Sequence, residues 1–390
     1  MTDRSFADRV AIVGLGSTDF HTLYRQPDPT ITAYDSAVRV AVQALEDSGL
    51  EKADLDGLAV SGFINDSIPY QQIAHRLGLQ EARYVQTIRD SARSLPSQLG
   101  HAAMAIMHGM ASSVLFVHSI NPRTTNYKFG ANLDNAELYD HVYGMASPGA
   151  WYAMALSRYL ALYNGSEEEL GAVAVAFRKW ASMNPLAIMK DRALSIEDYL
   201  NTRYVTKPMR LVDYCLVNDG AIAFILTSAE RGRDLKQPPV YLTSVTQQVQ
   251  LREQYASEDF WFRACGQMRE SLLYQIGLDI SHVDTLQVYD NFSPTVLWGL
   301  EGFGWAPQGD ALRWIQDGRL GPDGELPTNT SGGMLSEAYM MSWNQHAEMV
   351  RQLRGQAGPR QVENCNRAMY YGLSMVPGAS LLSSAATVGS

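Results

Sequence analysis

Cysteine is scarce in this chain. Cys215, Cys265 and Cys365 are the only three among 390 residues, and they lie far apart in the sequence. Structural zinc sites and disulfide frameworks need cysteines in close pairs or in larger sets. The scarcity therefore argues against both kinds of site, and it fits a reducing, cytoplasmic compartment.

Excess positive charge and long apolar runs are also absent. The chain has 31 Lys and Arg against 41 Asp and Glu, a formal net charge of −10. An acidic surface repels phosphate backbones, so we expect no nucleic-acid binding, although net charge does not describe a single pocket for CoA phosphates.

No run approaches the ~18 apolar residues of a membrane helix, and the first residues lack the apolar core of a secretory signal. We expect a soluble protein.

What is present is ordinary globular composition, with 46% hydrophobic and 18% charged residues. A length of 390 residues exceeds the size at which one core stops growing, so two domains are expected. The polar linker at 229–239 predicts domains at 1–230 and 238–390. A polar, irregular insertion at about 119–205 is expected to lie over the first domain, with one helix beginning at Ser166 in a capping box.

Apolar runs at 10–16, 113–118 and 218–227 predict buried strands. Apolar residues at helical spacing predict helices over 30–49 and 99–110, the second apolar nearly all round, with its methionines in the core. The Gly-Leu-Gly that ends the first run lacks the further glycine of a dinucleotide fingerprint, so we interpret it as structural.

The second half of the chain partly repeats the first. Residues 49–60 and 277–288 share Gly, Leu, an aliphatic residue, Asp, Leu and Val at the same offsets. A helix at His101 followed by a strand at Ser113 matches a helix at His346 followed by a strand at 367–371. The pattern predicts two copies of one α/β unit, each a sheet covered by helices.

Three segments are candidates for a shared pocket. Residues 289–292 follow a predicted strand, and the loop from Gly332 to Tyr339 leads into the helix of His346. Residues 89–94 precede the repeat-related helix of His101. In open α/β sheets the binding crevice lies beyond the carboxyl ends of strands, where helix N-termini attract anions. We expect the three segments to converge.

These motifs, in this order, resemble the thiolase superfamily over the whole chain. Residues 218–221 resemble its end-of-domain strand, and 289–292 resemble its Asn-Glu-Ala-Phe or His-Asp-Cys-Phe segment. Gly332-Gly333 resembles the loop before its catalytic histidine. The resemblance implies an α/β thiolase fold of two repeated domains, with mixed sheets layered with helices (αβαβα) and an inserted loop domain.

The departures from the thiolase pattern fall on its catalytic groups. Tyr339 stands at the histidine position, Ala92 at that of the nucleophilic cysteine and Gly372 at that of the acid/base cysteine. A thiolase forms an acyl-cysteine and later protonates a carbanion. Because this chain lacks those groups, it cannot follow that route, and its three cysteines are expected to be inert.

Tyrosines at 289 and 339 resemble the lipid-transfer-protein-like (sterol carrier protein thiolase-like) aldolases of bacterial steroid side-chain degradation. The resemblance implies cleavage of a β-hydroxyacyl-CoA to a ketone or aldehyde plus acetyl- or propionyl-CoA, with Tyr289 and Tyr339 as the catalytic pair. It also implies a homodimer, and a heterotetramer with a small partner protein that carries a zinc ribbon and an OB-fold. No cofactor or metal is expected in this chain; any zinc would belong to the partner.

Retro-aldol cleavage needs a base for the β-hydroxyl, an oxyanion site and an acid for the α-carbon. A phenol has a pKa of ~10, so about one in a thousand is ionised at pH 7, and one tyrosine needs a lowered pKa or a water relay. We hypothesise that Tyr339 removes the hydroxyl proton and Tyr289 supplies or relays the α-carbon proton, with the roles interchangeable. Asp290 is expected either to orient a tyrosine or to cap a helix or strand end. Asn291 is expected either to hold a water or to form a turn of the chain.

The oxyanion is expected to meet backbone N–H groups near Ser91 to Ser94 or a water on Asn291. The substrate loops would then comprise Ser91, Ala92, Ser94, Gly332, Gly333 and Gly372. Two other functions stay open. One is a condensing or acyl-transfer enzyme that uses Ser91 or Ser94, marked by a covalent acyl adduct. The other is a non-catalytic acyl-CoA or lipid carrier or scaffold.

Overall fold

The computed structural model describes residues 7–61, 69–88, 95–127, 142–145, 147–249, 259–374 and 376–386. One nine-stranded mixed sheet has the order β3-β2-β4-β7-β1-β8-β11-β10-β9, and β5 pairs with β6. The strands of the large sheet are β1 Val10–Ser17, β2 Gly57–Ser61, β3 Tyr84–Ile88, β4 Ser113–Ile120, β7 Gly220–Ser228, β8 Val240–Gln247, β9 Thr285–Val288, β10 Arg367–Gly372 and β11 Gly378–Ser383; the small pair is β5 Tyr204–Thr206 and β6 Met209–Arg210.

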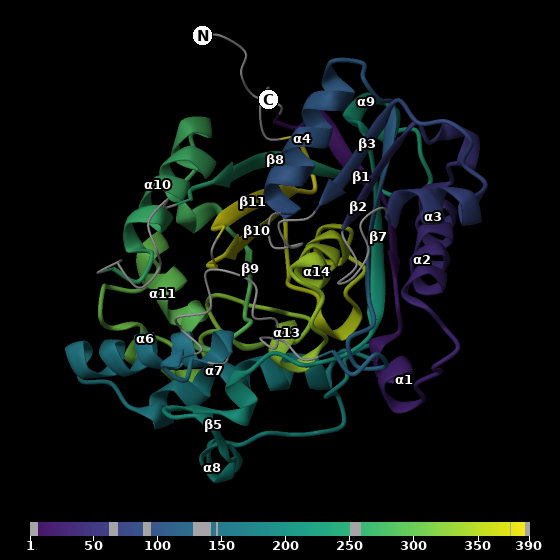
Figure 1. Ribbon diagram of the computed structural model, residues 1–390. Helices are drawn as coiled ribbons and strands as arrows, with labels where there is room; N and C mark the ends of the chain where they lie inside the picture. Colours follow the sequence, from purple (N-terminus) through teal and green to yellow (C-terminus); the bar gives the residue numbers. More distant parts are fainter. Residues whose placement is uncertain are drawn as a thin grey trace.

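Helices cover the two halves of this sheet and lie between them (Figure 1). Helices α2 and α3 lie outside the first half, α4 and α14 lie between the halves, and α10 and α11 lie outside the second. Their bounds are α1 Phe20–Arg25, α2 Ala33–Ser48, α3 Pro69–Leu77, α4 Leu95–Met107, α6 Pro148–Tyr163, α7 Glu167–Ser182, α8 Ile196–Asn201, α9 Ala229–Gly232, α10 Phe262–Leu272, α11 Pro294–Phe303, α12 Ala311–Trp314, α13 Gly333–Ser336 and α14 Trp343–Leu353.

The predicted internal repeat is present in the strand pairing. In the first half β2 is parallel to β4, β4 antiparallel to β7, and β7 antiparallel to β1. In the second half β9, β10, β11 and β8 follow the same sequence of directions. The counterpart of β3 is reduced to a single parallel bridge between Leu286 and Thr328, and the Gly-Gly loop follows directly. The αβαβα layering expected from the resemblance is confirmed.

Three apolar clusters fill the spaces between layers. The central one joins both sheet halves to α4 and α14, and it contains Tyr289 and Tyr339. The glycines of the β1 run have a packing role, because a Cβ at Gly16 would lie 1.9 Å from the Val40 carbonyl of α2. They let the helix backbone approach the strand closely, which agrees with the structural interpretation of this run.

Two expectations were wrong. The insertion, expected to be irregular apart from the helix that begins at Ser166, also contains the long helix α6, and both helices pack against the second half of the chain in the same cluster as Leu297. Alanine, leucine and aromatic residues at helical spacing outweighed the local polarity. The methionines around α4 are not all core residues, because Met104 and Met110 are about half exposed. The capping box at Ser166 is present. The described part of the chain contains no helix long and apolar enough to cross a membrane.

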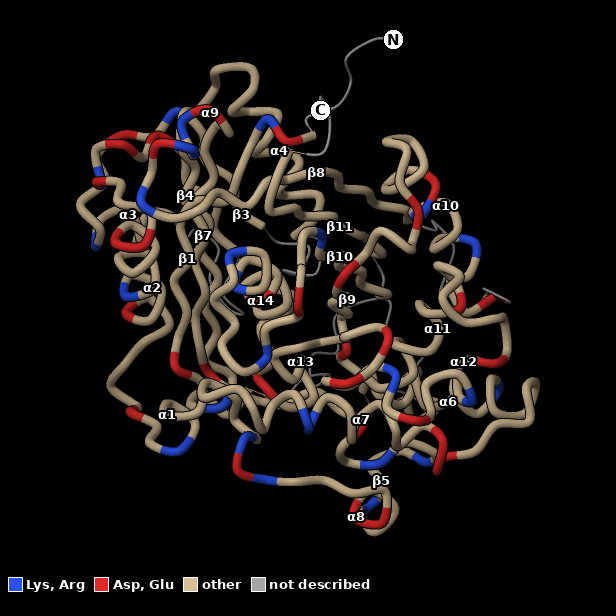
Figure 2. The backbone as a smooth tube through the Cα atoms, turned by 180° about the vertical axis from the view of Figure 1, so that it is seen from behind, with Lys and Arg blue, Asp and Glu red and all other residues tan. Residues whose placement is uncertain are grey.

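Lys and Arg positions alternate with Asp and Glu positions along the backbone of α2, α3 and α10 (Figure 2). The two-domain division at 1–230 and 238–390 stays a prediction.

Candidate active site

Two tyrosines from separate segments meet inside the central cluster. Tyr289 follows β9, and its backbone N–H donates to the Tyr371 carbonyl of β10 at 2.9 Å. Tyr339 lies three residues beyond the end of α13. Their Oη atoms are 3.4 Å apart, and the residues are 1% and 8% exposed. This separation is longer than the ~2.5–3.0 Å of an ordinary O–H···O hydrogen bond, so a proton would pass between the phenols on closer approach or through a water.

The Gly-Gly loop passes so close to Asp290 that a side chain on the second glycine does not fit. Gly332 and Gly333 have φ values of +105° and +60°, which favour glycine. A Cβ on Gly333 would lie 2.3 Å from Asp290 Oδ2. The loop therefore wraps onto Asp290, and this approach sets where the chain continues toward Tyr339.

Asp290 is hydrogen-bonded to that loop. Its Oδ1 accepts from the Met334 N–H at 2.8 Å and from Gln345 Nε2 at 3.0 Å, and its Oδ2 accepts from the Leu335 N–H at 3.1 Å. Burial raises the pKa of the carboxyl to about 7, against the opposing effect of these donors. The contacts match the capping interpretation: Asp290 ties the first turn of α13 to the end of β9.

Asn218 holds the backbone of Tyr339 and was not among the predicted site residues. Its Oδ1 accepts from the Tyr339 N–H at 2.7 Å, and its Nδ2 lies 3.5 Å from the Tyr339 carbonyl. In the sequence Asn218 marked only the start of a strand. The partners are 121 positions apart in the chain, and no local sequence pattern records the contact.

Gly372 lies against Tyr289, the other tyrosine of the pair. A Cβ there would be 2.5 Å from Tyr370 Oη and 3.2 Å from Tyr289 Cβ, so a cysteine does not fit without a shift. Asn291 is buried, and its Oδ1 has no hydrogen-bond partner in the described part of the chain. That acceptor is available to a water or substrate group. Ser91, Ala92 and Ser94 lie outside the described residues.

A buried polar network supports the loop from behind. Glu337 accepts from Asn184 Nδ2 at 3.1 Å and from Asn344 Nδ2 at 3.2 Å, and Arg351 Nη1 lies 3.9 Å from its carboxylate. Burial raises the pKa of Glu337, and Arg351 opposes the shift. Buried ionic groups that lose a partner are costly, so this network fixes the segment two residues before Tyr339.

The remaining titratable groups nearby do not supply thiolase chemistry. His346 is fully buried; its Nδ1 is 2.8 Å from the Ser342 carbonyl and its Nε2 is 2.9 Å from Ser380 Oγ. Burial lowers its pKa to about 4, so the ring is neutral at pH 7. Burial also raises the thiol pKa of Cys215 and Cys365 to about 12 each and that of Cys265 further. Thiols with raised pKa values are poor nucleophiles.

Comparison with known proteins identifies the family of the chain. Residues 246–387 match the family model for the thiolase C-terminal domain-like family. A 17-hydroxy-3-oxo-4-pregnene-20-carboxyl-CoA lyase of Mycobacterium tuberculosis is 35% identical over 364 residues, covering 89% of this chain and 92% of the relative. A steroid side-chain-cleaving aldolase of Thermomonospora curvata is 33% identical, covering 88% and 90%. The chain belongs to the thiolase-fold steroid side-chain-cleaving aldolases.

Solved structures of this superfamily superpose on the chain. The one described as "Ltp2-ChsH2(DUF35) aldolase" has a TM-score of 0.88 at 30% identity, covering 97% of this chain and 98% of that chain. The structure of an acetyl-CoA acetyltransferase from Syntrophomonas wolfei has a TM-score of 0.68 at 17% identity, covering 97% of this chain and 99% of that chain, and it shows a likeness of fold alone. The family and fold expected from the sequence motifs are both confirmed.

Proposed function

We propose that this aldolase-family chain is a carbon–carbon lyase that cleaves a β-hydroxyacyl-CoA, a steroid side-chain thioester, to a ketone or aldehyde plus acetyl- or propionyl-CoA. The observation that carries the proposal is the pair of phenols 3.4 Å apart. They come from the segments that hold catalytic groups in thiolases. The names of the relatives from M. tuberculosis and T. curvata, a CoA-thioester lyase and a steroid side-chain-cleaving aldolase, support the substrate class.

In the proposed cleavage Tyr339, acting as the phenolate, accepts the proton of the β-hydroxyl directly or through a water and becomes a neutral phenol. The bond between the α- and β-carbons breaks, and the β-carbon leaves as the carbonyl of the ketone or aldehyde. The electron pair of that bond forms the thioester enolate, and Tyr289 supplies or relays a proton to the α-carbon. The roles of the two tyrosines are interchangeable in this scheme, because either phenol can give up or take up a proton.

The enolate oxygen needs donors that are already in place. A water on Asn291 Oδ1 is the candidate among the described residues, because that buried atom has no partner there. Asn218, Asp290 and Glu337 are proposed as positioning residues. Asn218 accepts a hydrogen bond from the Tyr339 backbone, and Asp290 and Glu337 hold the loop that precedes Tyr339.

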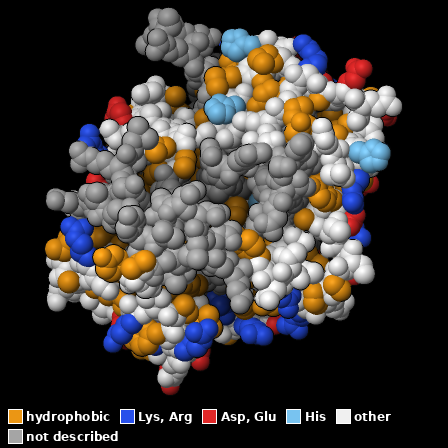
Figure 3. Space-filling view, viewed as in Figure 1, with side chains coloured by type: hydrophobic (Ala, Val, Ile, Leu, Met, Phe, Trp, Pro, Cys, Tyr) orange, Lys and Arg blue, Asp and Glu red, His pale blue; other side chains and the backbone are white. Residues whose placement is uncertain are grey.

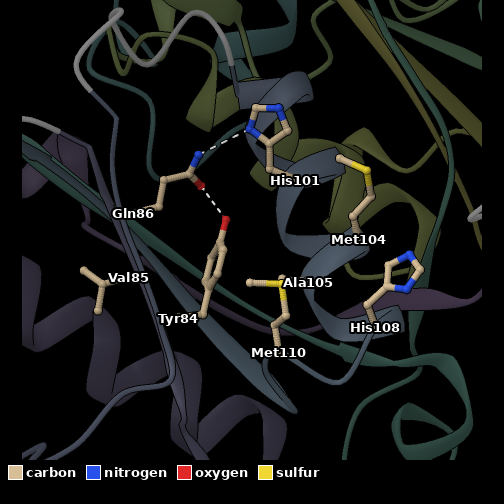
Figure 4. A pocket seen from close by; sticks show the side chains of 8 residues that line it. All are labelled: Tyr84, Val85, Gln86, His101, Met104, Ala105, His108 and Met110. Atoms are coloured by element: carbon tan, nitrogen blue, oxygen red, sulfur yellow. Dashed lines mark hydrogen bonds between the residues drawn. The ribbon is translucent and has the colours of Figure 1, made fainter.

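We further propose a homodimer that forms through β3. Among the strands of the described residues β3 is at the edge of the nine-stranded sheet, and an open edge invites pairing with another chain. Beside it is a pocket of about 370 Å³ lined by Tyr84, Val85, Gln86, His101, Met104, Ala105, His108 and Met110 (Figure 4). Exposed hydrophobic side chains and histidines gather over α4 and β3 (Figure 3). A second copy of the chain would cover this surface.

A partner protein completes the proposed assembly. The solved neighbour is named for two proteins, Ltp2 and ChsH2(DUF35). By analogy we propose a small zinc-ribbon/OB-fold partner, a heterotetramer with the dimer described above, and a cytoplasmic location consistent with three free cysteines.

The decisive experiment is mass analysis of products after incubation with β-hydroxyacyl-CoA thioesters, with and without the co-expressed partner. We expect acetyl- or propionyl-CoA plus a ketone or aldehyde without added free CoA. Absence of cleavage across steroid and aromatic substrates, with the partner bound, would favour the carrier or scaffold function. A covalent acyl adduct would instead favour acyl transfer.

A further inference from the structure

A second pocket lies behind the segment that carries Tyr339. Its volume is about 420 Å³, and it is lined by Tyr24, Arg25, Arg123, Ile188, Met189 and Arg192. Its wall is bonded to that segment: the Ile188 N–H donates to the Glu337 carbonyl at 3.0 Å and the Met189 N–H to the Ser336 carbonyl at 3.1 Å. The stretch leading into α8, with both blue and red positions, passes beside α1 (Figure 2).

Three arginines give this pocket a local positive charge in a chain of net charge −10. Asp191 is paired with Arg25 at 2.8 Å, and both side chains are half exposed. The guanidinium of Arg123 lies 3.8 Å from the centre of the Tyr24 ring, which fixes its plane. Within the described residues Arg123 and Arg192 have no carboxylate partner.

A fourth arginine lies behind the pocket. Arg178 is 8% exposed; its Nε donates to Ser336 Oγ and its Nη1 to the Arg192 carbonyl, both at 2.9 Å. These acceptors are neutral. Burial and the nearby Arg192 charge lower the pKa of Arg178 to about 10. Arg178 is the buried member of the four, whereas Arg25 and Arg192 are exposed. With Asp191 as the one carboxylate paired with an arginine here, the pocket keeps an excess of positive charge that an anion can neutralise.

We propose that this arginine pocket binds the phosphate group of a small molecule. Guanidinium groups bind phosphate through two parallel hydrogen bonds, and several around one cavity can hold a doubly charged oxyanion. The Tyr24 ring, Ile188 and Met189 form apolar walls for an organic body attached to the phosphate. Two sources share this chemistry: the nucleotide end of a CoA thioester, which rests on the proposed function, and a free phosphate compound, which does not.

The test is calorimetric titration of the full chain, in its complex with the partner, with inorganic pyrophosphate, CoA and dephospho-CoA. Arg192→Gln and Arg123→Gln remove the charges without carboxylate partners. Arg313→Gln is the matched control, because this arginine is 53% exposed and pairs with Asp310 away from the pocket. Each pocket variant is expected to weaken phosphate binding about tenfold or more, with the control unchanged.

The ligands distinguish the two sources. Pyrophosphate affinity that falls in both variants, with CoA affinity unchanged, supports a free phosphate compound. Tighter binding of CoA than of dephospho-CoA, lost in Arg192→Gln, supports the nucleotide end. Equal affinities in wild type and both variants for every probe would overturn the proposal. So would loss of partner binding in the variants without any phosphate binding, since that result assigns the pocket to an acidic protein segment. Pyrophosphate binding does not depend on aldolase activity, so the two proposals can fail separately.

Discussion

At the residue scale, the tyrosine hydroxyls are the groups that the proposed chemistry uses directly. Tyr339→Phe and Tyr289→Phe each remove one oxygen and leave the ring packed in the central cluster. We expect the rate of cleavage to fall about 10²- to 10⁴-fold in each, as for loss of a general acid or base. Tyr274→Phe, at an exposed position, is the control. Steady-state rates and unfolding curves measure both effects; full activity in either variant would remove that tyrosine from the mechanism.

A second residue-scale prediction concerns His118 in β4. This ring is fully buried and stacked on Trp343, and neither nitrogen has a hydrogen-bond partner in the described part of the chain. Burial lowers its pKa from 6.5 to about 3. Above pH 6.5 the His118 ring is neutral in both the folded and the unfolded chain. As the pH falls toward 3, the ring gains a proton in the unfolded chain alone. Stability is therefore lost on acidification.

His118→Leu removes this proton uptake. Between pH 6.5 and 5 the variant should lose about 2 kcal/mol less free energy of unfolding than the wild type does. At pH 7 it should be neutral or more stable by about 1 kcal/mol, because an unpaired polar group has gone. Urea unfolding at both pH values measures this, with the exposed His282→Gln as control. An unchanged pH slope would contradict the assignment.

At the element scale, the Gly-Gly loop and α13 form the device that places Tyr339. Gly333→Ala places an alanine at a positive φ, which costs free energy of folding, and brings its Cβ into collision with Asp290. Gly355→Ala has a similar positive φ but nothing within 4 Å of the added Cβ, so it isolates the backbone cost. We expect Gly355→Ala to cost about 1 kcal/mol and keep activity. Gly333→Ala should cost about 3 kcal/mol and lose activity. Similar effects of the two substitutions on both properties would show that the contact with Asp290 is unimportant.

The elements that the sequence predicted well are those with strong periodicity or a repeat. The match of 49–60 with 277–288 corresponds to β2 and β9, and the helix over 30–49 is α2 with its glycine cap. The insertion was mispredicted because α6 and α7 draw their stability from contacts with the second half. Asn218 and Glu337 were missed for the same reason: their partners are distant in the chain, and no local pattern records such contacts.

At the scale of the whole molecule, the proposed dimer would form at the edge of the sheet that β3 makes. Val85 on β3 is 46% exposed, and Met110 beside it is 55% exposed. Exposed apolar side chains next to unpaired strand edges are hidden in stable assemblies or blocked by charge. In the proposed dimer these side chains would be buried against the second copy.

A lysine at this edge should therefore separate the subunits. Val85→Lys and Met110→Lys bring like charges together across the proposed interface and leave them without water, so we expect a shift from twice the 43.2 kDa chain mass to the single mass. Met154→Lys on α6 is the matched control, because Met154 is also 55% exposed but α6 lies on the opposite side of the molecule from β3 (Figure 1). Light scattering after size exclusion measures the mass. A dimer that survives both edge variants would place the interface on another face, whereas dissociation by Met154→Lys would assign it to α6.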